Sequence, residues 1–152
     1  MICLTVDIII FDFTASHKKI LLIQRNKPPF EGEWAFPGGF VDINETLEKA
    51  AARELEEETG LKNIILKQFY AFSAIDRDPR QRTVSVVFFG FVDKSNNKIK
   101  AGSDARNAKW VLLDDIPNLA FDHHEILQKI IEDLTKNQYF GKLSAHNLKP
   151  ET

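Results

Sequence analysis

The chain has 152 residues, of which 43% are hydrophobic and 28% are charged, and its formal net charge is −2. This length and apolar fraction fit one folded domain and argue against intrinsic disorder. Because 20 basic residues nearly balance 22 acidic ones, the composition does not indicate a nucleic acid or an anionic membrane as a partner.

The same composition excludes several kinds of site. The single cysteine, Cys3, rules out an internal disulfide framework and a cysteine-based zinc site. No apolar run approaches the ~20 residues of a membrane span, and the N-terminus lacks the basic region of a secretory signal. We therefore expect one cytoplasmic domain over residues 1–152, with residues 139–152 as a polar C-terminal tail.

The first part of the chain predicts two strands and a long loop. Residues 5–13 and 19–25 are rich in β-branched and aromatic side chains, which favour strands. Residues 26–44 contain two clusters of proline and glycine, so most of this stretch is expected to be loop.

A helix over residues 45–59 is expected to follow this loop. Asn44 is placed to cap its N-terminus, because an asparagine side chain accepts a hydrogen bond from a first-turn amide. Gly60 is placed to end the helix in the left-handed conformation that glycine adopts most easily.

The second half of the chain predicts further strands and a second helix. Strand-like runs lie at residues 64–75, 83–92 and 108–113, with a short extended segment at residues 98–100. Asp122 is placed to cap the second helix, and Glu125 completes a capping-box pattern. Strands interrupted by two helices predict an α/β (α+β) fold with a mixed sheet and helices on its faces.

Three glutamates cluster on one face of the first helix. At about 100° per residue, Glu54, Glu57 and Glu58 project into a single arc, whereas Glu56 points away. Like charges at this spacing, close to a helix C-terminus, are unfavourable. A divalent cation would remove the repulsion, and carboxylate oxygens are ligands that Mg²⁺ prefers. A solvated acidic face is the alternative.

The spacing around these glutamates resembles the motif of the Nudix hydrolase family, G-x5-E-x7-R-E-U-x-E-E-x-G-U, in which U is aliphatic. The matching positions are Gly39, Glu45, Arg53, Glu54, Leu55, Glu57, Glu58, Gly60 and Leu61. Segments that are also similar to the family lie at residues 21–25, 34–39 and 110–117. The resemblance therefore covers most of residues 4–135.

The resemblance implies a Nudix-type α/β/α sandwich with a mixed β-sheet, in which the motif forms a loop–helix–loop. It also implies a hydrolase that uses Mg²⁺ or Mn²⁺ to cleave a nucleoside diphosphate linked to another group. Homodimers are frequent in the family, so a homodimer is the expected assembly, by analogy alone.

The roles of several residues follow from their positions in the motif. Glu54, Glu57 and Glu58 would be metal ligands, and the backbone carbonyl of Gly38 would join them. Arg53 would orient a glutamate, with Glu57 one helical turn away as its candidate partner.

Three further polar positions are less directly tied to the motif. Asp104 lies in the segment where many family members place an acidic residue, and it is our candidate for the general base. Glu45 either stabilises the N-terminus of the helix or takes part in catalysis. The tandem His123-His124 is expected on the surface, in the first turn of the second helix.

Segments outside the motif resemble one branch of the family, which contains ADP-ribose pyrophosphatases and the ADP-ribose-sensing domains of Nudix-related transcriptional regulators. These segments are residues 32–42, 76–80 and 119–123. Pro79 lies 19 positions after Gly60, later than the proline that commonly marks the pyrophosphatases, and Gln81 stands where glycine is common. The regulators carry an additional winged-helix DNA-binding domain, for which this length leaves no room, so no nucleic-acid partner is expected.

Candidate substrate contacts are cationic and aromatic, because guanidinium groups suit phosphate and aromatic rings stack on bases. The cations are Arg25, Arg77, Arg80 and Arg82, and the aromatic residues are Trp34 and Phe36. A solvated basic turn is the alternative for residues 77–82, and a place in the core is the alternative for the two rings.

Together these features predict a divalent-metal-dependent pyrophosphohydrolase that converts ADP-ribose to AMP and ribose 5-phosphate. A MutT-like nucleoside triphosphate pyrophosphohydrolase is one alternative. A non-catalytic module that senses ADP-ribose is the other.

Overall fold

The computed structural model describes residues 1–14, 16–102 and 105–137. Seven strands are present in this part of the chain: β1 (Cys3–Asp12), β2 (Lys19–Arg25), β3 (Trp34–Ala35), β4 (Gly38–Phe40), β5 (Lys67–Phe72), β6 (Thr83–Phe91) and β7 (Ala105–Leu112). The helices are α1 (Leu47–Thr59) and α2 (His123–Lys136), and single 3-10 turns lie at Lys94–Asn96 and Leu113–Asp115. No helix in these ranges is long and apolar enough to cross a membrane.

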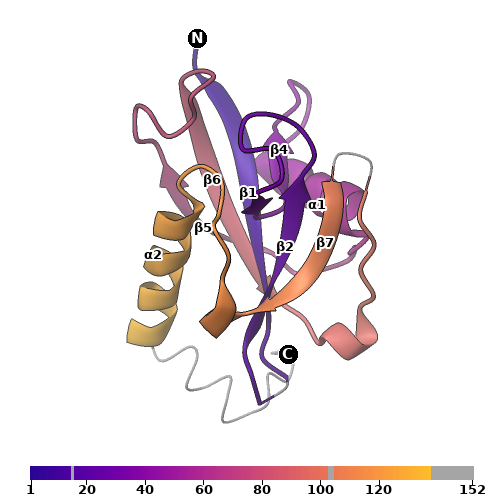
Figure 1. The fold of residues 1–152 in the computed structure, drawn as a ribbon. Coiled ribbons are helices and arrows are strands. Elements are labelled where there is room, and N and C mark those ends of the chain that lie inside the picture. The colour runs from indigo at the N-terminus through magenta and orange to yellow at the C-terminus, as the bar shows by residue number, and fades with distance from the viewer. Residues whose placement is uncertain (15, 103–104, 138–152) are drawn as a thin grey trace.

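The strands form one mixed sheet with β1 near its centre (Figure 1). The order is β3-β2-β1-β6-β5, with β4 also paired to β1 and β7 to β2. β1 and β6 run parallel from Cys3 opposite Thr83 to Phe11 opposite Phe91. The other strand pairs are antiparallel, which confirms the mixed sheet predicted from the sequence.

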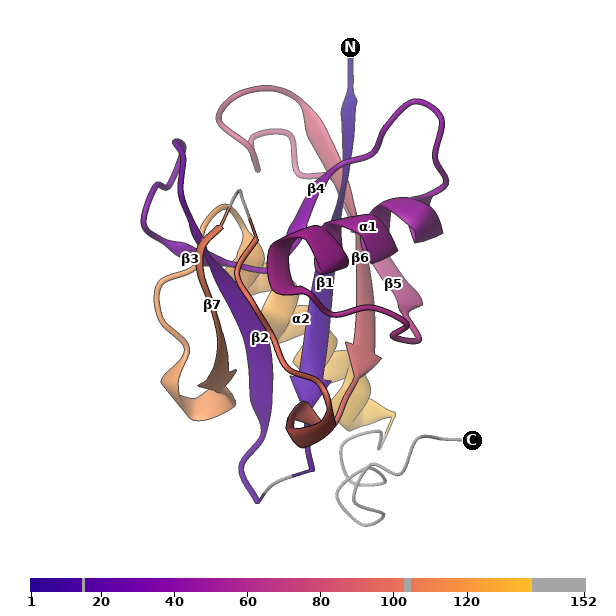
Figure 2. The ribbon, with the colours of Figure 1, turned by 90° about the vertical axis from the view of Figure 1, so that its right-hand side faces the viewer.

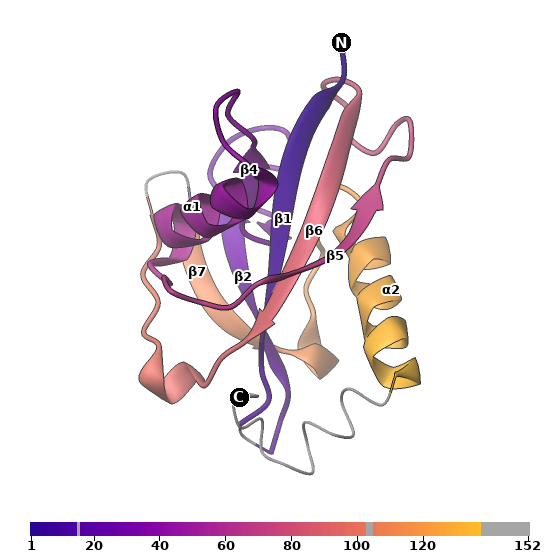
Figure 3. The ribbon, with the colours of Figure 1, turned by 180° about the vertical axis from the view of Figure 1, so that it is seen from behind.

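The two helices cover opposite faces of the sheet (Figures 2 and 3). Along β1, the side chains of Val6, Ile8 and Ile10 pack in the cluster that includes α1. The intervening Ile9 and Phe11 pack in the cluster that includes α2. Because both faces of β1 are buried, its sequence is a nearly continuous apolar run rather than an alternating one. The α/β/α arrangement is therefore confirmed.

The predicted limits of α1 are correct at its C-terminus and wrong at its N-terminus. The cap is Thr46, whose side chain accepts a hydrogen bond from the Lys49 amide at 3.1 Å, whereas Asn44 lies in the preceding turn. Both residue types cap helices well, so composition alone did not distinguish them. Gly60 has φ 79° and its amide donates to the Glu56 carbonyl, as its position in the sequence indicated.

The strand predictions need two corrections. The run at residues 64–75 forms a strand only over Lys67–Phe72, because Ile65 and Ile75, each 79% exposed, lie outside the pairing with β6. Residues 98–100 form no strand. Their backbone instead follows the C-terminal end of α1, where the Lys100 amide donates to the Thr59 carbonyl at 2.7 Å.

The predicted capping box at α2 is wrong. Asp122 occupies the residue before the helix, but its side chain makes no capping hydrogen bond. Its carboxylate instead accepts two hydrogen bonds from Arg77, at 2.9 Å from Nε and 2.7 Å from Nη2. A bidentate charge-assisted pair is stronger than a neutral cap, so the long-range partner prevails.

Packing of α2 on the sheet predicts the effect of a core truncation. Ile130 is fully buried in the cluster that joins α2 to β1, so Ile130→Ala should lower the free energy of unfolding by about 2–5 kcal/mol. The exposed Glu132 lies on the same helix, and Glu132→Ala should change stability by no more than about 0.5 kcal/mol. Urea unfolding measures both variants. Equal effects would contradict this account of the α2 interface.

Candidate functional site

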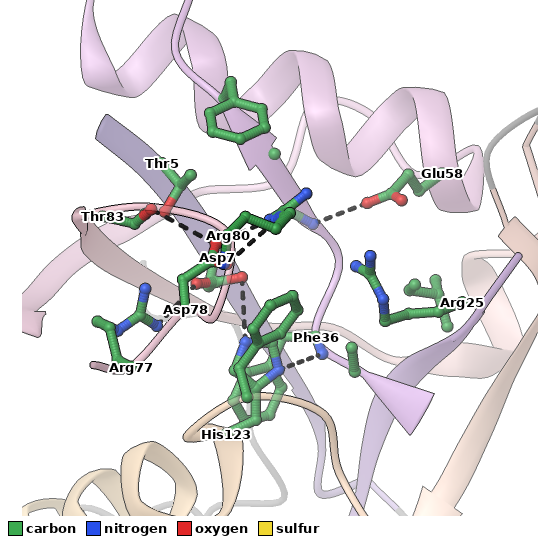
Figure 4. A pocket seen from close by; sticks show the side chains of 16 residues that line it. Thr5, Asp7, Arg25, Phe36, Glu58, Arg77, Asp78, Arg80, Thr83 and His123 are labelled. Atoms are coloured by element: carbon green, nitrogen blue, oxygen red, sulfur yellow. Dashed lines mark hydrogen bonds and ion pairs between the residues drawn. The ribbon is translucent and has the colours of Figure 1, made fainter. Parts of the chain in front are cut away.

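The acidic face of α1 lies against the backbone of β4. The Gly38 amide donates to Oε1 of Glu58 at 2.7 Å, an interaction visible in Figure 4. A Cβ atom built on Gly39 would lie 2.5 Å from the carboxylate of Glu54. A side chain at position 39 would therefore displace this carboxylate, which gives the first glycine of the motif a physical reason.

Arg53 connects the carboxylates of this face. Its Nη1 donates to Glu54 at 2.7 Å and to Glu57 at 3.0 Å, so the predicted contact with Glu57 is present. Its Nε and Nη2 donate to Glu45 at 3.0 and 2.6 Å, and Nη2 also donates to the Phe40 carbonyl at 3.0 Å. One guanidinium thus fixes α1, the loop before it and β4 relative to one another.

Glu45 is the anchor of Arg53. Hydrogen bonds from Arg53, and a further one from the Asp42 amide, lower the pKa of Glu45 to about 2. The hydrogen bonds of Arg53 to Glu45 and Glu54 raise the pKa of Arg53 above its already high ordinary value. Of the two roles considered for Glu45, the structure therefore shows a structural one, exercised through Arg53 rather than through the end of the helix.

The three glutamates differ in exposure, which matters for ligand binding. The side chain of Glu57 is 55% exposed and that of Glu54 is 14% exposed, and Glu58 is buried. In residues 1–14, 16–102 and 105–137, no three His, Cys, Asp or Glu side chains converge into a preformed cation site. Like charges repel, and each carboxylate contacts the nearest N–H donor, on Arg53 or Gly38.

This donor set nevertheless suits a hard divalent cation. Carboxylate oxygens on one helix face are the ligands that Mg²⁺ and Mn²⁺ bind. Because Gly39 carries no side chain, the Glu54 carboxylate can lie where a Cβ atom would otherwise be. The predicted Gly38 carbonyl ligand stays a prediction, since the observed contact of Gly38 with Glu58 is through its amide.

A pocket adjoins this acidic face (Figure 4). It holds about 580 Å³ of empty space, counted out to open solvent, and its lining joins Glu58 to β1, β2, the turn before β6 and the start of α2. Of the predicted contacts, the pocket is lined by Arg25, Phe36, Gly38, Glu58, Arg77 and Arg80.

The arginines of the pocket are not equivalent. Arg77 is buried, with 3% of its side chain exposed, and pairs with Asp122. Arg80 pairs with Asp78 at 2.8 Å. Arg25 donates from Nε to the Pro29 carbonyl at 2.7 Å and forms no ion pair with a carboxylate in the described part of the chain. Among the described residues, Arg25 is therefore the pocket arginine without a carboxylate as a direct partner.

Burial and the neighbouring positive charge of Arg80 lower the pKa of Arg25. Its guanidinium lies 4.9 Å from the ring centroid of Phe121. The guanidinium of Arg80 lies 5.6 Å from that ring and 5.4 Å from the ring of Phe40. These aromatic contacts hold both cations in place without neutralising them.

Two of the predicted substrate contacts are not brought into the pocket. Trp34 packs against the core on the α2 side, with Nζ of Lys109 at 4.3 Å from its ring centroid. Arg82 is not among the lining residues, and its Nη1 is buried without a hydrogen-bond partner in the part of the chain that the structure describes. Asp104 lies outside the described residues.

His123 is a pocket residue that was not expected from the sequence, and the expectation that it lies on the surface is wrong. Its exposed fraction is 2%, its Nδ1 accepts a hydrogen bond from the Phe36 amide at 3.2 Å, and its ring stacks on Phe36 at 4.6 Å. Of the tandem pair His123-His124, only His124 is exposed. The sequence spacing could have indicated that His123 is buried, because Ile126 and Ile130 follow it at helical intervals on the buried face of α2.

Asp7 was also missed. It interrupts an apolar strand, and its carboxylate accepts a hydrogen bond from Ser85 Oγ at 2.5 Å and lies 3.5 Å from Nε2 of His123. Burial alone would raise the pKa of Asp7, but His123, Ser85 and Arg77 outweigh burial and lower it. The sequence feature that could have indicated its role is an acidic residue within an apolar, strand-like run, because a charge in such a position needs a partner.

The similarity of the chain to known proteins agrees with this arrangement of site residues. A family model described as NUDIX domain matches residues 1–134. The ADP-ribose pyrophosphatase of Methanocaldococcus jannaschii is 46% identical over 110 residues, which cover 72% of this chain and 64% of that protein. The ADPR responsive transcriptional repressor NtrR of Acinetobacter baylyi is 33% identical over 151 residues, covering 97% of this chain and 60% of the repressor. The chain thus spans less than two thirds of either relative.

Solved structures show the same fold. The NUDIX domain of Shewanella oneidensis NrtR, in a cocrystal structure with ADP ribose, is 31% identical with a TM-score of 0.81, and the match covers 88% of this chain and 89% of that one. A MutT/nudix family protein from Enterococcus faecalis has the same TM-score of 0.81 at 32% identity, covering 90% of this chain and 63% of that one.

The lowered pKa of Glu45 predicts a pH-dependent contribution to stability. Its ordinary value is about 4.3 and its folded value is about 2, so its contribution is complete above the ordinary value and is lost as pH falls through the folded value. Glu45→Gln should therefore be less stable than the parent at pH 7, and the difference should shrink towards pH 2. Urea unfolding at several pH values measures it, with the exposed Glu56→Gln as control. A difference that stays constant would contradict the prediction.

Proposed function

Because the chain belongs to the Nudix family, we propose that it is a divalent-metal-dependent pyrophosphohydrolase that cleaves ADP-ribose to AMP and ribose 5-phosphate. The main support is a pocket whose lining contains both Glu58 of the acidic face of α1 and Arg25, which has no carboxylate partner within residues 1–14, 16–102 and 105–137. The similarity to an ADP-ribose pyrophosphatase and to a domain crystallised with ADP ribose supports the choice of substrate.

Glu54, Glu57 and Glu58 would hold Mg²⁺ or Mn²⁺. When bound, such a cation neutralises the diphosphate and lowers the pKa of the attacking water. Arg53 orients Glu54 and Glu57 by hydrogen bonds at 2.7 and 3.0 Å. The Gly38 amide orients Glu58. In the reaction, a bond forms between water oxygen and one phosphorus, the bond from that phosphorus to the bridging oxygen breaks, and the released protons go to solvent.

Arg25 would bind the negative charge of the substrate. A guanidinium in a half-buried pocket suits a phosphate oxygen, because the charge-assisted hydrogen bond forms where water is partly excluded. Arg77 and Arg80, which are already paired with Asp122 and Asp78, instead build the wall of the pocket.

The adenine base would stack on Phe40 rather than on Phe36. Phe40 is 42% exposed and lines the pocket, and the Arg80 guanidinium at 5.4 Å from its ring centroid leaves part of the ring available. Phe36 is 2% exposed, and its ring is already stacked on His123.

A sensing role is the second candidate, supported by the similarity to the NtrR repressor over 97% of this chain. Against it, all the carboxylates of the motif are retained, and Glu57 is exposed enough to reach a cation. Action in the cytoplasm and assembly as a homodimer stay predictions.

The direct test is incubation of the purified protein with ADP-ribose and either Mg²⁺ or Mn²⁺, followed by detection of AMP and ribose 5-phosphate. The double variant Glu57→Gln/Glu58→Gln should lose about 100-fold or more in kcat, the scale observed when a group that stabilises transition-state charge is removed. Glu56→Gln, on the opposite side of α1, should retain parental kcat. Tight ADP-ribose binding without turnover would favour the sensing role instead.

Two other outcomes would contradict specific parts of the proposal. Release of inorganic pyrophosphate and a nucleoside monophosphate from nucleoside triphosphates, without ADP-ribose cleavage, would favour the MutT-like alternative. Parental turnover in the double glutamine variant would overturn the metal-ligand assignment.

The role of Arg25 predicts a graded series. Arg25→Ala should raise KM for ADP-ribose about 10- to 100-fold, since a hydrogen bond to a charged group contributes about 1.5–3 kcal/mol. Arg25→Lys should lie between, because lysine keeps the charge but not the planar fork. Lys136→Ala, an exposed cation at the far end of α2, is the control. An unchanged KM in Arg25→Ala would remove Arg25 from the substrate contacts.

A further inference from the structure

His123 connects the start of α2 to the segment between β3 and β4. Nδ1 accepts the Phe36 amide hydrogen at 3.2 Å, so this nitrogen carries no proton of its own. The ring proton is therefore on Nε2, which faces Oδ1 of Asp7 at 3.5 Å. Both ring nitrogens are thus directed at fixed partners inside the protein, as Figure 4 shows.

The segment that His123 holds leads directly to the acidic face. Only Pro37 separates Phe36 from Gly38, and the proline ring restricts φ at this position. The Pro37 carbonyl accepts from the Ile8 amide at 2.8 Å, and the Gly38 amide donates to Glu58 at 2.7 Å. A shift at Phe36 is therefore transmitted along a short, stiff backbone to the amide that orients Glu58.

Asp7 restrains the same segment from the side of the sheet. It pairs with Gly38 across β1 and β4, and a Cβ atom on Gly38 would lie 2.6 Å from Oδ1 of Asp7. Besides His123, the carboxylate contacts Ser85, and Arg77 lies at 4.0 Å. His123 on α2 and Asp7 on β1 thus both contact the segment from Phe36 to Gly38.

We propose that His123 is a positioning residue, which holds the Phe36–Gly39 backbone and, through the Gly38 amide, the carboxylate of Glu58 in the geometry required for hydrolysis. The proposal rests on the pyrophosphohydrolase function argued above. An apolar ring would stack on Phe36 equally well, but it would leave the buried Phe36 amide without an acceptor, which is costly. The requirement is for the acceptor at the Nδ1 position, and not for ring volume.

This requirement separates two substitutions of similar size. In His123→Asn, the side-chain oxygen takes the place of Nδ1 and can accept from the Phe36 amide. In His123→Gln, the longer amide reaches the place of Nε2, towards Asp7, and leaves the Phe36 amide without its acceptor. The same two substitutions at His17, an exposed turn residue, are the matched controls.

The first measurement uses the free protein, without metal or substrate. Amide hydrogen exchange, followed by NMR, should be faster at Phe36 and Gly38 in His123→Gln by about 10-fold or more, the equivalent of one hydrogen bond of about 1.5 kcal/mol. His123→Asn should retain most of the protection, and the His17 variants all of it. Equal loss of protection throughout the protein in both His123 variants would mean a packing role only and would overturn the proposal.

The second measurement separates positioning from substrate binding. In ADP-ribose hydrolysis, His123→Gln should lose about 10-fold or more in kcat with little change in KM, and His123→Asn should recover most of the loss. A raised KM with unchanged kcat and unchanged exchange would show that His123 binds substrate instead, and would overturn the proposal. If the parent protein hydrolyses no ADP-ribose, the proposed function fails, whereas the exchange measurement still decides whether His123 holds Phe36 and Gly38.

Discussion

The site depends on one guanidinium placed among mutually repelling carboxylates. Arg53 lies within 4.0 Å of the carboxylates of Asp42, Glu45, Glu54 and Glu57. Without a positive charge there, the repulsion between i,i+3 and i,i+4 glutamates would oppose both the helix and the close approach of β4. Because Arg53 is anchored by a bidentate contact with Glu45, the glutamates that face solvent are oriented before any ligand arrives, which reduces the entropy that binding must overcome.

The sheet supplies the second constraint. β1 is buried on both faces and pairs with β6, β4 and β2, so its position is fixed by packing on two sides. The one acidic residue in the middle of this strand, Asp7, is tolerated because Ser85 and His123 satisfy its oxygens. That arrangement places a polar cluster in the lining of the pocket, on the strand at the centre of the sheet.

Local patterns predicted the parts of the structure whose partners are local. The presence of helix α1, its end at Gly60 and the shared face of Glu54, Glu57 and Glu58 follow from spacing along one element, although the predicted start and cap of the helix were wrong. Residues whose partners lie far along the chain were misjudged, because a capping pattern at Asp122 does not reveal that Arg77, 45 positions earlier, competes for its carboxylate. The surface expectation for His123 failed for the same reason, since its acceptor role depends on Phe36, 87 positions away.

Pairing, rather than the number of charges, decides what the basic residues of the pocket do. Arg77 and Arg80 look equivalent to Arg25 in the sequence, but two aspartates neutralise them, and their guanidinium groups then stiffen the wall. Arg25 has a carbonyl rather than a carboxylate as its direct partner, so its positive charge is available to an incoming anion. Among the described residues, the lining of the pocket therefore combines Arg25, which has no carboxylate partner, with Glu58 of the acidic face. A metal-bound diphosphate matches that combination, because its metal suits the carboxylates while its remaining charge suits Arg25.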